Sequence, residues 1–152
     1  MASKRHSKKT RIGSPEESTF VELLRTCDLL SRRLASVLKT ADLSPNQYNV
    51  LRILRGAPEG LACGEIACRM ITRDPDVTRL LDRLEKRGLI ARCRESGDRR
   101  MVLTRITGEG LRALAELDQS IQDVHRQQLG HLGVNGLGAL SELLQLARKH
   151  LA

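Results

Sequence analysis

A mainly α-helical fold with one small β-hairpin is predicted by three observations. Several stretches space their apolar residues at helical intervals. Two short β-compatible runs, at residues 89–94 and 101–106, flank a polar segment typical of a hairpin. Of the 152 residues, 40% are hydrophobic, which is enough for a packed core, and no apolar run is long enough for a membrane-spanning helix.

The amino-terminal half predicts three helices. In residues 16–40 apolar positions recur every three or four residues, with charged residues mostly on the opposite face. Ser44 is a predicted N-cap and Pro45 a predicted first helical residue, so a second helix begins there and ends near Gly56. Cys63 to Met70 fits a short third helix.

A fourth helix is predicted over about residues 74–87. Asp74 would cap it, Pro75 would occupy its first position, and Gly88 would close it. The residues predicted to face the core are Val77, Leu80, Leu81 and Leu84.

The carboxyl-terminal third predicts two more helices. Thr107 is a predicted N-cap, and the helix after it buries a stripe that begins at Leu111. A final helix carries an apolar stripe from Leu137 to Leu151. The glycines expected to interrupt the helical pattern between these stripes are Gly130, Gly133, Gly136 and Gly138.

The charge of the chain points to a polyanionic partner. Its formal net charge is +8, and the basic residues gather in a tail, residues 1–14, and in residues 69–105. The sequence holds one Phe, one Tyr and no Trp, which argues against binding single strands by base stacking. The tail is either a solvated extension or a flexible arm along DNA phosphates, and its sequence does not decide between the two.

Two short helices followed by a basic hairpin predict a winged helix-turn-helix that binds duplex DNA. The helix at 74–87 would enter the major groove and the wing at 95–100 the minor groove. Arg79 is expected to bond guanine. Asp76 either caps the helix locally or accepts a hydrogen bond from a cytosine amino group. The expected DNA-binding residues are Arg73, Asp76, Thr78, Arg79, Arg83, Arg99 and Arg100.

Residues 74–90 and 97–107 resemble the multiple antibiotic resistance regulator (MarR) family. The family pattern Pro-x-Val-Thr-Arg-Leu-x-Asp-Arg-Leu-Glu-x-Arg-Gly-Leu begins at Pro75, and the wing motif Asp-x-Arg is Asp98 to Arg100. The resemblance implies a homodimeric transcription factor, with Arg100 in the minor groove and Asp98 orienting a neighbouring Arg. One departure is Ala62, where relatives usually carry a hydroxyl cap.

The expected organisation has four parts. Residues 1–14 are a disordered basic tail, 15–42 an N-terminal dimerisation helix, 43–107 the winged helix-turn-helix DNA-binding domain, and 108–152 the C-terminal dimerisation helices. A homodimer would bind a pseudo-palindromic operator with half-sites about 10–10.5 bp apart. The alternative is that the flanking helices pack within one chain.

The resemblance also implies a repressor released by a small aromatic or anionic effector. Arg25, Arg52 and Arg55 are candidate partners for an effector anion, although they are equally ordinary surface residues. Cys27 is the candidate for the alternative of a thiol redox sensor, but its place on the apolar stripe favours a buried neutral thiol. A further alternative is a winged-helix adaptor that binds protein and not DNA.

Enzyme activity, metals and export are not expected. The sequence contains no catalytic motif or phosphate-binding loop, and its histidines lack metal-ligand spacing. The expectation is therefore a protein without cofactor or metal. The four cysteines form no CxxC pair and the amino terminus has no apolar signal segment, which predicts a cytoplasmic protein with reduced thiols.

Overall fold

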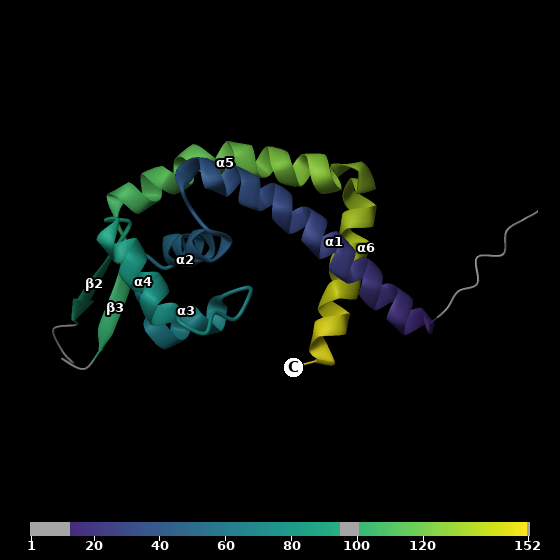
Figure 1. The fold of residues 1–152 in the computed structure, drawn as a ribbon, viewed down its shortest axis with the longest axis horizontal. Coiled ribbons are helices and arrows are strands. Elements are labelled where there is room, and N and C mark those ends of the chain that lie inside the picture. The colour runs from purple at the N-terminus through teal and green to yellow at the C-terminus, as the bar shows by residue number, and fades with distance from the viewer. Residues whose placement is uncertain (1–12, 95–100, 152) are drawn as a thin grey trace, which may run out of the picture. The chain divides into compact units, whose positions relative to one another are not determined.

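A computed structural model describes residues 13–94 and 101–151. These residues form two compact units divided between Arg32 and Arg33. The helices and strands, in chain order, are α1 (Pro15–Leu38), the 3-10 turn η1 (Lys39–Ala41), α2 (Pro45–Arg55), β1 (Leu61–Ala62), α3 (Cys63–Arg69), α4 (Val77–Lys86), β2 (Ile90–Arg94), β3 (Val102–Ile106), α5 (Gly108–Leu129), the 3-10 turn η2 (Gly130–Leu132) and α6 (Gly133–Lys149) (Figure 1).

The first unit is the amino-terminal part of α1. Glu16 and Glu17 lie in its first turn, where carboxylates stabilise the positive end of the helix dipole. Its large apolar side chains are not covered within this unit. Phe20 is 59% exposed and Leu24 55%.

The second unit contains the hydrophobic core, to which α2, α4 and α5 contribute most. The N-terminus of α2 confirms the predicted cap, because Ser44 Oγ accepts from Gln47 N at 3.2 Å and Gln47 Oε1 accepts from Ser44 N at 3.0 Å. The buried apolar residues are Leu38, Leu43, Val50, Leu51, Leu54, Ala57, Leu61, Ile66, Leu80, Leu81, Leu84, Leu89, Ile90, Leu114, Leu117, Ile121 and Val124.

A three-stranded antiparallel sheet has the order β1-β3-β2. The hairpin of β2 and β3 was predicted, and Arg92 and Thr104 are direct partners in it. The strand β1 was not predicted, because two residues are too few to show alternation. It pairs Leu61 with Thr104 and so joins the hairpin to the segment just before α3.

The start of α5 agrees with the prediction, while the glycines behave only partly as expected. Thr107 Oγ1 accepts from Gly110 N at 3.2 Å and donates to Gly88 O at 2.6 Å. The helix breaks at η2 and restarts at Gly133, which has φ +65°. The prediction that Gly136 and Gly138 interrupt the helix is wrong, since both lie inside α6. Neither has a φ in the left-handed region, so an ordinary helical backbone accommodates them.

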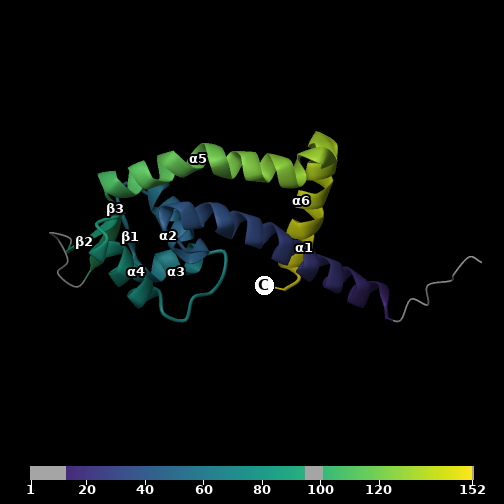
Figure 2. The ribbon, with the colours of Figure 1, turned by 45° about the horizontal axis from the view of Figure 1, so that its top comes forward.

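The helix-turn-helix elements gather beside the sheet in Figures 1 and 2, with α5 leading away from it. No residue of α6 is buried in the single chain. Among the residues that the structure describes, no helix is long and apolar enough to cross a membrane.

Candidate nucleic-acid interface

The helix α4 begins later than predicted. Its N-cap is Asp76, whose Oδ1 accepts from Arg79 N at 3.1 Å, so the prediction that Asp74 caps and Pro75 opens the helix is wrong. The carboxylate of Asp74 is used elsewhere: its Oδ2 accepts from Asn46 Nδ2 at 2.8 Å and its Oδ1 from Asp76 N at 2.9 Å. Residues 74–76 therefore form the approach to α4 and not its first turn.

This approach is attached to the N-terminus of α2. Asn46 makes two hydrogen bonds to this segment. Besides the bond from its Nδ2 to Asp74, its Oδ1 accepts from Thr72 Oγ1 at 3.0 Å. The donors at Asp76 N and Asn46 lower the pKa of Asp74 below its usual value, since they stabilise the carboxylate. Sequence reasoning did not identify Asn46 or Thr72, which lie 28 and 2 residues from Asp74.

The inner face of α4 is anchored as predicted. Leu80, Leu81 and Leu84 are buried and Val77 is half-buried. The helix ends with Gly88 at φ +71°, where Leu89 N donates to Leu84 O at 3.1 Å. Glycine adopts this left-handed geometry without the cost of a Cβ clash. Both ends and one face of α4 are therefore fixed, which orients its outer face.

The outer face of α4 is basic and exposed. Arg79, Arg83 and Lys86 follow one another at helical spacing and are all exposed, as is Thr78. The Arg79 side chain is 70% exposed and its Nε lies 3.2 Å from Asp76 Oδ2. The guanidinium of Arg79 is therefore at the surface, where it pairs with the carboxylate of the N-cap residue Asp76.

The two acidic residues of α4, Asp82 and Glu85, are held by Arg92 of β2. Arg92 Nη2 lies 2.5 Å from Asp82 Oδ1 and 2.6 Å from Glu85 Oε2, and Arg92 Nε donates to Glu85 Oε2 at 3.0 Å. The Arg92 backbone N–H also donates to Glu85 Oε1 at 3.2 Å. These hydrogen bonds lower the pKa of Glu85 and raise that of Arg92.

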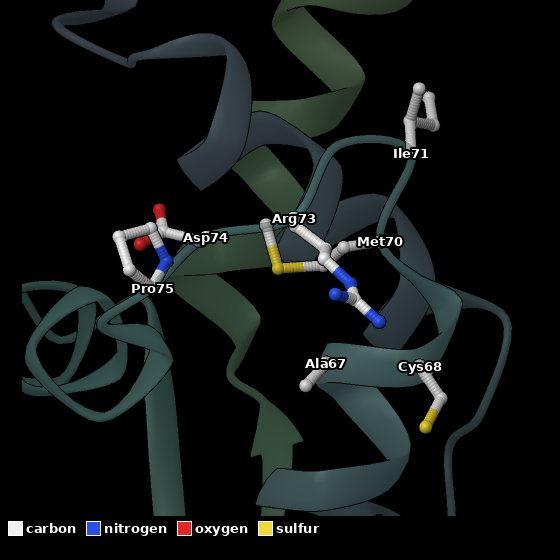
Figure 3. A pocket seen from close by; sticks show the side chains of 7 residues that line it. All are labelled: Ala67, Cys68, Met70, Ile71, Arg73, Asp74 and Pro75. Atoms are coloured by element: carbon white, nitrogen blue, oxygen red, sulfur yellow. The ribbon is translucent and has the colours of Figure 1, made fainter.

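A hollow lies between α3 and the segment that leads to α4 (Figure 3). Ile71 is one of the residues that line the hollow, and it is 76% exposed. Arg73, one of the expected DNA-binding residues, lines the hollow and is exposed. The residues that line it are Ala67, Cys68, Met70, Ile71, Arg73, Asp74 and Pro75.

The wing is described only at its two strands. Arg99, Arg100 and Asp98 lie outside the described residues. The strands on either side, β2 and β3, place Arg94 and Arg105 at the surface. Arg105 Nε donates to Glu59 O at 2.8 Å, which attaches β3 to the turn before β1.

The candidate effector-binding arginines are all exposed, and each has a polar neighbour. Arg25 is in the first unit, and its Nη1 lies 3.3 Å from Oε1 of Glu22 on the same helix. Arg55 Nη1 donates to both carboxylate oxygens of Asp118 on α5 at 2.9 Å. Arg52 lies on α2 with its Nη2 at 3.4 Å from the Oδ1 of buried Asn49.

The cysteines are unpaired thiols among the described residues. Cys27 is exposed in the first unit, so the expected burial of its thiol is not found within the chain. The same helix face carries Phe20 and Leu24, which are also exposed. Cys63 is half-buried at the start of α3, whose N-cap is Ala62. Ala62 has no side-chain oxygen, but its N–H donates to Glu65 Oε2 at 2.9 Å.

Sequence reasoning missed two structural arginines. Arg92 joins α4 to β2, and Arg87, just after α4, donates to the carbonyls of Asp42 at 2.6 Å and Ala41 at 3.2 Å. Both had the appearance of ordinary surface residues. The available sign for Arg92 was the i,i+3 spacing of Asp82 and Glu85, which places two carboxylates on one flank of the helix.

The region that contains the helix-turn-helix is similar to a known protein family. The model of the MarR family matches residues 43–102. The transcriptional regulator PecS of Dickeya dadantii is 30% identical over 85% of this chain and 79% of its own length. A MarR transcription factor from Planctomyces limnophilus is 37% identical, with a TM-score of 0.68 over 90% of this chain and 99% of that one. The chain belongs to the MarR family.

Two further MarR-family structures contain bound molecules. A cysteine-to-serine mutant of MarR from Escherichia coli, in complex with operator DNA, is 25% identical, with a TM-score of 0.77 over 87% of this chain and 95% of that one. NadR in complex with 4-hydroxyphenylacetate is also 25% identical, with a TM-score of 0.72 over 90% and 96%. MarR-family members are transcriptional regulators that bind DNA, and the family is not one of enzymes.

Proposed function

We propose that this protein binds specific sequences of duplex DNA and acts as a homodimeric repressor of transcription. The observation that carries the proposal is the exposed basic face of α4, with Arg79, Arg83 and Lys86 outward and three leucines behind. A helix of this width fits the major groove, and its amino-terminal turn reaches base edges. The DNA-bound MarR relative supports the same use of the fold.

Within this proposal the residues have separate tasks. Arg79 bonds a guanine, Arg73, Thr78 and Arg83 approach phosphates, and Asp76 supports Arg79 from the N-cap. Arg99 and Arg100 contact DNA from the wing, and Asp98 orients its neighbour. A small aromatic or anionic effector would release the DNA, as suggested by the ligand-bound relative NadR.

The apolar faces left open in the single chain support the homodimer. Phe20 and Leu24 of α1, and Leu143 and Leu146 of α6, are each more than half exposed. Two copies would bury these faces together and present two copies of α4 to a pseudo-palindromic operator. The cytoplasm is the compartment where such a regulator meets DNA.

The deciding experiment is selection of bound sequences from a random duplex pool. We expect a pseudo-palindrome with half-sites about one helical turn apart. Arg79→Ala should relax base preference at one position per half-site, at a cost of about 1–3 kcal/mol there. Arg100→Ala should weaken binding with less change in preference.

A matched control is Arg126→Ala, which removes an exposed Arg near the far end of α5 that pairs with Asp123. Its affinity and base preference should equal those of the parent. If selection recovered no common sequence, or if Arg79→Ala behaved like the control, the proposal would fail. Affinity should also fall steeply with salt, by about 0.9 in the log–log slope per phosphate contact.

A further inference from the structure

The helix α4, which we propose meets DNA, carries acidic as well as basic residues. The helix has three basic residues, Arg79, Arg83 and Lys86, and two acidic ones, Asp82 and Glu85. Unpaired, the two carboxylates would offset most of the positive charge in a helix that lies between phosphate backbones. The structure pairs both of them with one guanidinium from outside the helix.

That guanidinium belongs to Arg92, in the middle of β2. Three contacts of 3.0 Å or less join it to the two carboxylates, and the Arg92 backbone N–H adds a fourth contact to Glu85. The Arg92 side chain is 28% exposed, against 46% for Asp82 and 38% for Glu85, so the cluster is partly covered. A planar fork that bonds two acceptors fixes both a direction and a distance, which a single ammonium group does not.

The cluster also spans two elements with different anchoring. The helix α4 is fixed by three buried leucines. Within the part of the chain that the structure describes, the strand β2 lies at an edge of the sheet, next to β3. Arg92 therefore supplies side-chain bonds that hold the edge strand of the wing against the helix.

We infer that Arg92 is a positioning residue for DNA binding: it fixes β2 on α4 and screens the carboxylates of Asp82 and Glu85 from DNA phosphates. The inference rests on the DNA-binding function proposed above. Arg92 acts through the two acids and does not need to contact DNA itself.

The test compares Arg92→Met in two backgrounds, the parent and the double variant Asp82→Asn/Glu85→Gln. In the parent, Arg92→Met should lower affinity for the selected duplex by about tenfold, because it leaves two carboxylates beside the phosphates. In the double variant the same change should cost less than about threefold, because no charge remains to be screened. Equal losses in both backgrounds would mean that Arg92 contacts DNA directly, and no loss in the parent would mean that it has no role; either result overturns the inference.

Two controls separate this role from charge and from folding. Arg112→Gln removes an Arg whose partner, Glu109, lies on its own helix, so affinity should not change. Arg92→Lys keeps the charge but cannot bond both acids as a planar fork, so its affinity should fall between those of the parent and Arg92→Met. Should Arg92→Met unfold, Arg92→Lys takes its place in both backgrounds.

A measurement without DNA keeps the inference distinct from the proposed function. Amide hydrogen exchange on the free protein should speed up at residues 90–94 in Arg92→Met, with no change at residues 45–55 of α2. If the parent bound no duplex, the proposed function would fail, and this measurement would still decide whether Arg92 holds the strand. Unchanged exchange at residues 90–94 would overturn the positioning role regardless of the DNA results.

Discussion

At the scale of single residues, Asp76 has two separable tasks. Its Oδ1 caps α4 through Arg79 N, and its Oδ2 lies 3.2 Å from Arg79 Nε. Asp76→Ala should lower the free energy of unfolding by about 0.5–2 kcal/mol, which is the usual cost of losing an N-cap, as measured by urea denaturation.

The replacement Asp76→Ser separates the cap from base contact. Serine is also a good N-cap, so stability should return to near that of the parent. If Asp76 only caps the helix, the selected sequence should stay the same in Asp76→Ser. A shift at a C·G position other than the one that Arg79→Ala changes, with restored stability, would instead show that the carboxylate accepts from a cytosine amino group.

The carboxylate of Glu85 makes stability depend on pH. The hydrogen bonds from Arg92 hold the pKa of Glu85 below its ordinary value of 4.5 in the folded protein, so the unfolded chain binds more protons in acid. The stabilisation is therefore present above pH 4.5 and is lost as the pH falls below it. The free energy of unfolding should drop less between pH 5 and pH 3 in Glu85→Gln than in the parent, by denaturant titration at each pH. Equal drops would contradict this.

The residues that sequence could assign are those whose role is local. The exposure of Arg79 and the burial of Leu80, Leu81 and Leu84 follow from helical periodicity alone. The partner of Asp74 does not, because Asn46 lies on another helix and no local rule connects them. Asp74 and Pro75 predicted a helix start, but the carboxylate of Asp74 instead accepts a long-range hydrogen bond from Asn46.

At the scale of elements, the junction of α5 with the sheet depends on a glycine. A Cβ at Gly110 would lie 2.3 Å from Leu89 O and 2.6 Å from Ile106 Cγ1. Because the first of these is a backbone atom, α5 would have to move away from the hairpin. Gly110→Ala should therefore lower the free energy of unfolding by about 1–3 kcal/mol, as measured by thermal or urea denaturation.

The control is Gly108→Ala, two residues earlier in the same helix and on a different side. The nearest atom to its Cβ would be the end of the flexible Arg112 side chain, at 3.8 Å. Alanine is the better helix former, so stability should be unchanged or slightly higher. A similar loss in both variants would show that helix propensity, and not the contact with Leu89, is responsible.

Elements with a long repeating pattern were predictable and short ones were not. Ser44, Pro45 and Thr107 marked helix starts correctly, because caps are encoded within a few residues. The strand β1 has two residues and owes its existence to pairing with β3. Gly136 and Gly138 were expected to break a helix, but an isolated glycine costs only about 1 kcal/mol there.

At the scale of the molecule, α6 stands out because none of its residues is buried in the single chain. Leu143→Lys combined with Leu146→Lys should prevent the proposed dimer, because two charges would enter an apolar interface. Sedimentation velocity should show a monomer, and duplex affinity should fall because only one half-site can be held.

A matched variant is Gln145→Lys, which adds a charge on the polar side of the same helix, where Gln145 Nε2 donates to Ser141 Oγ at 3.2 Å. It should remain a dimer and keep its affinity. If the double leucine variant were also a dimer, the exposed leucines of α6 would not form the interface.

The central position of β3 has a mechanical meaning. One edge of this strand pairs with the residues that open α3, its other edge pairs with the strand bonded to α4, and its carboxyl end runs directly into the cap of α5. We therefore expect a displacement of any one of these helices to be transmitted to the others through β3, a strand of five residues. Because β3 links α3, α4 and α5, we expect the orientations of these three helices to be coupled.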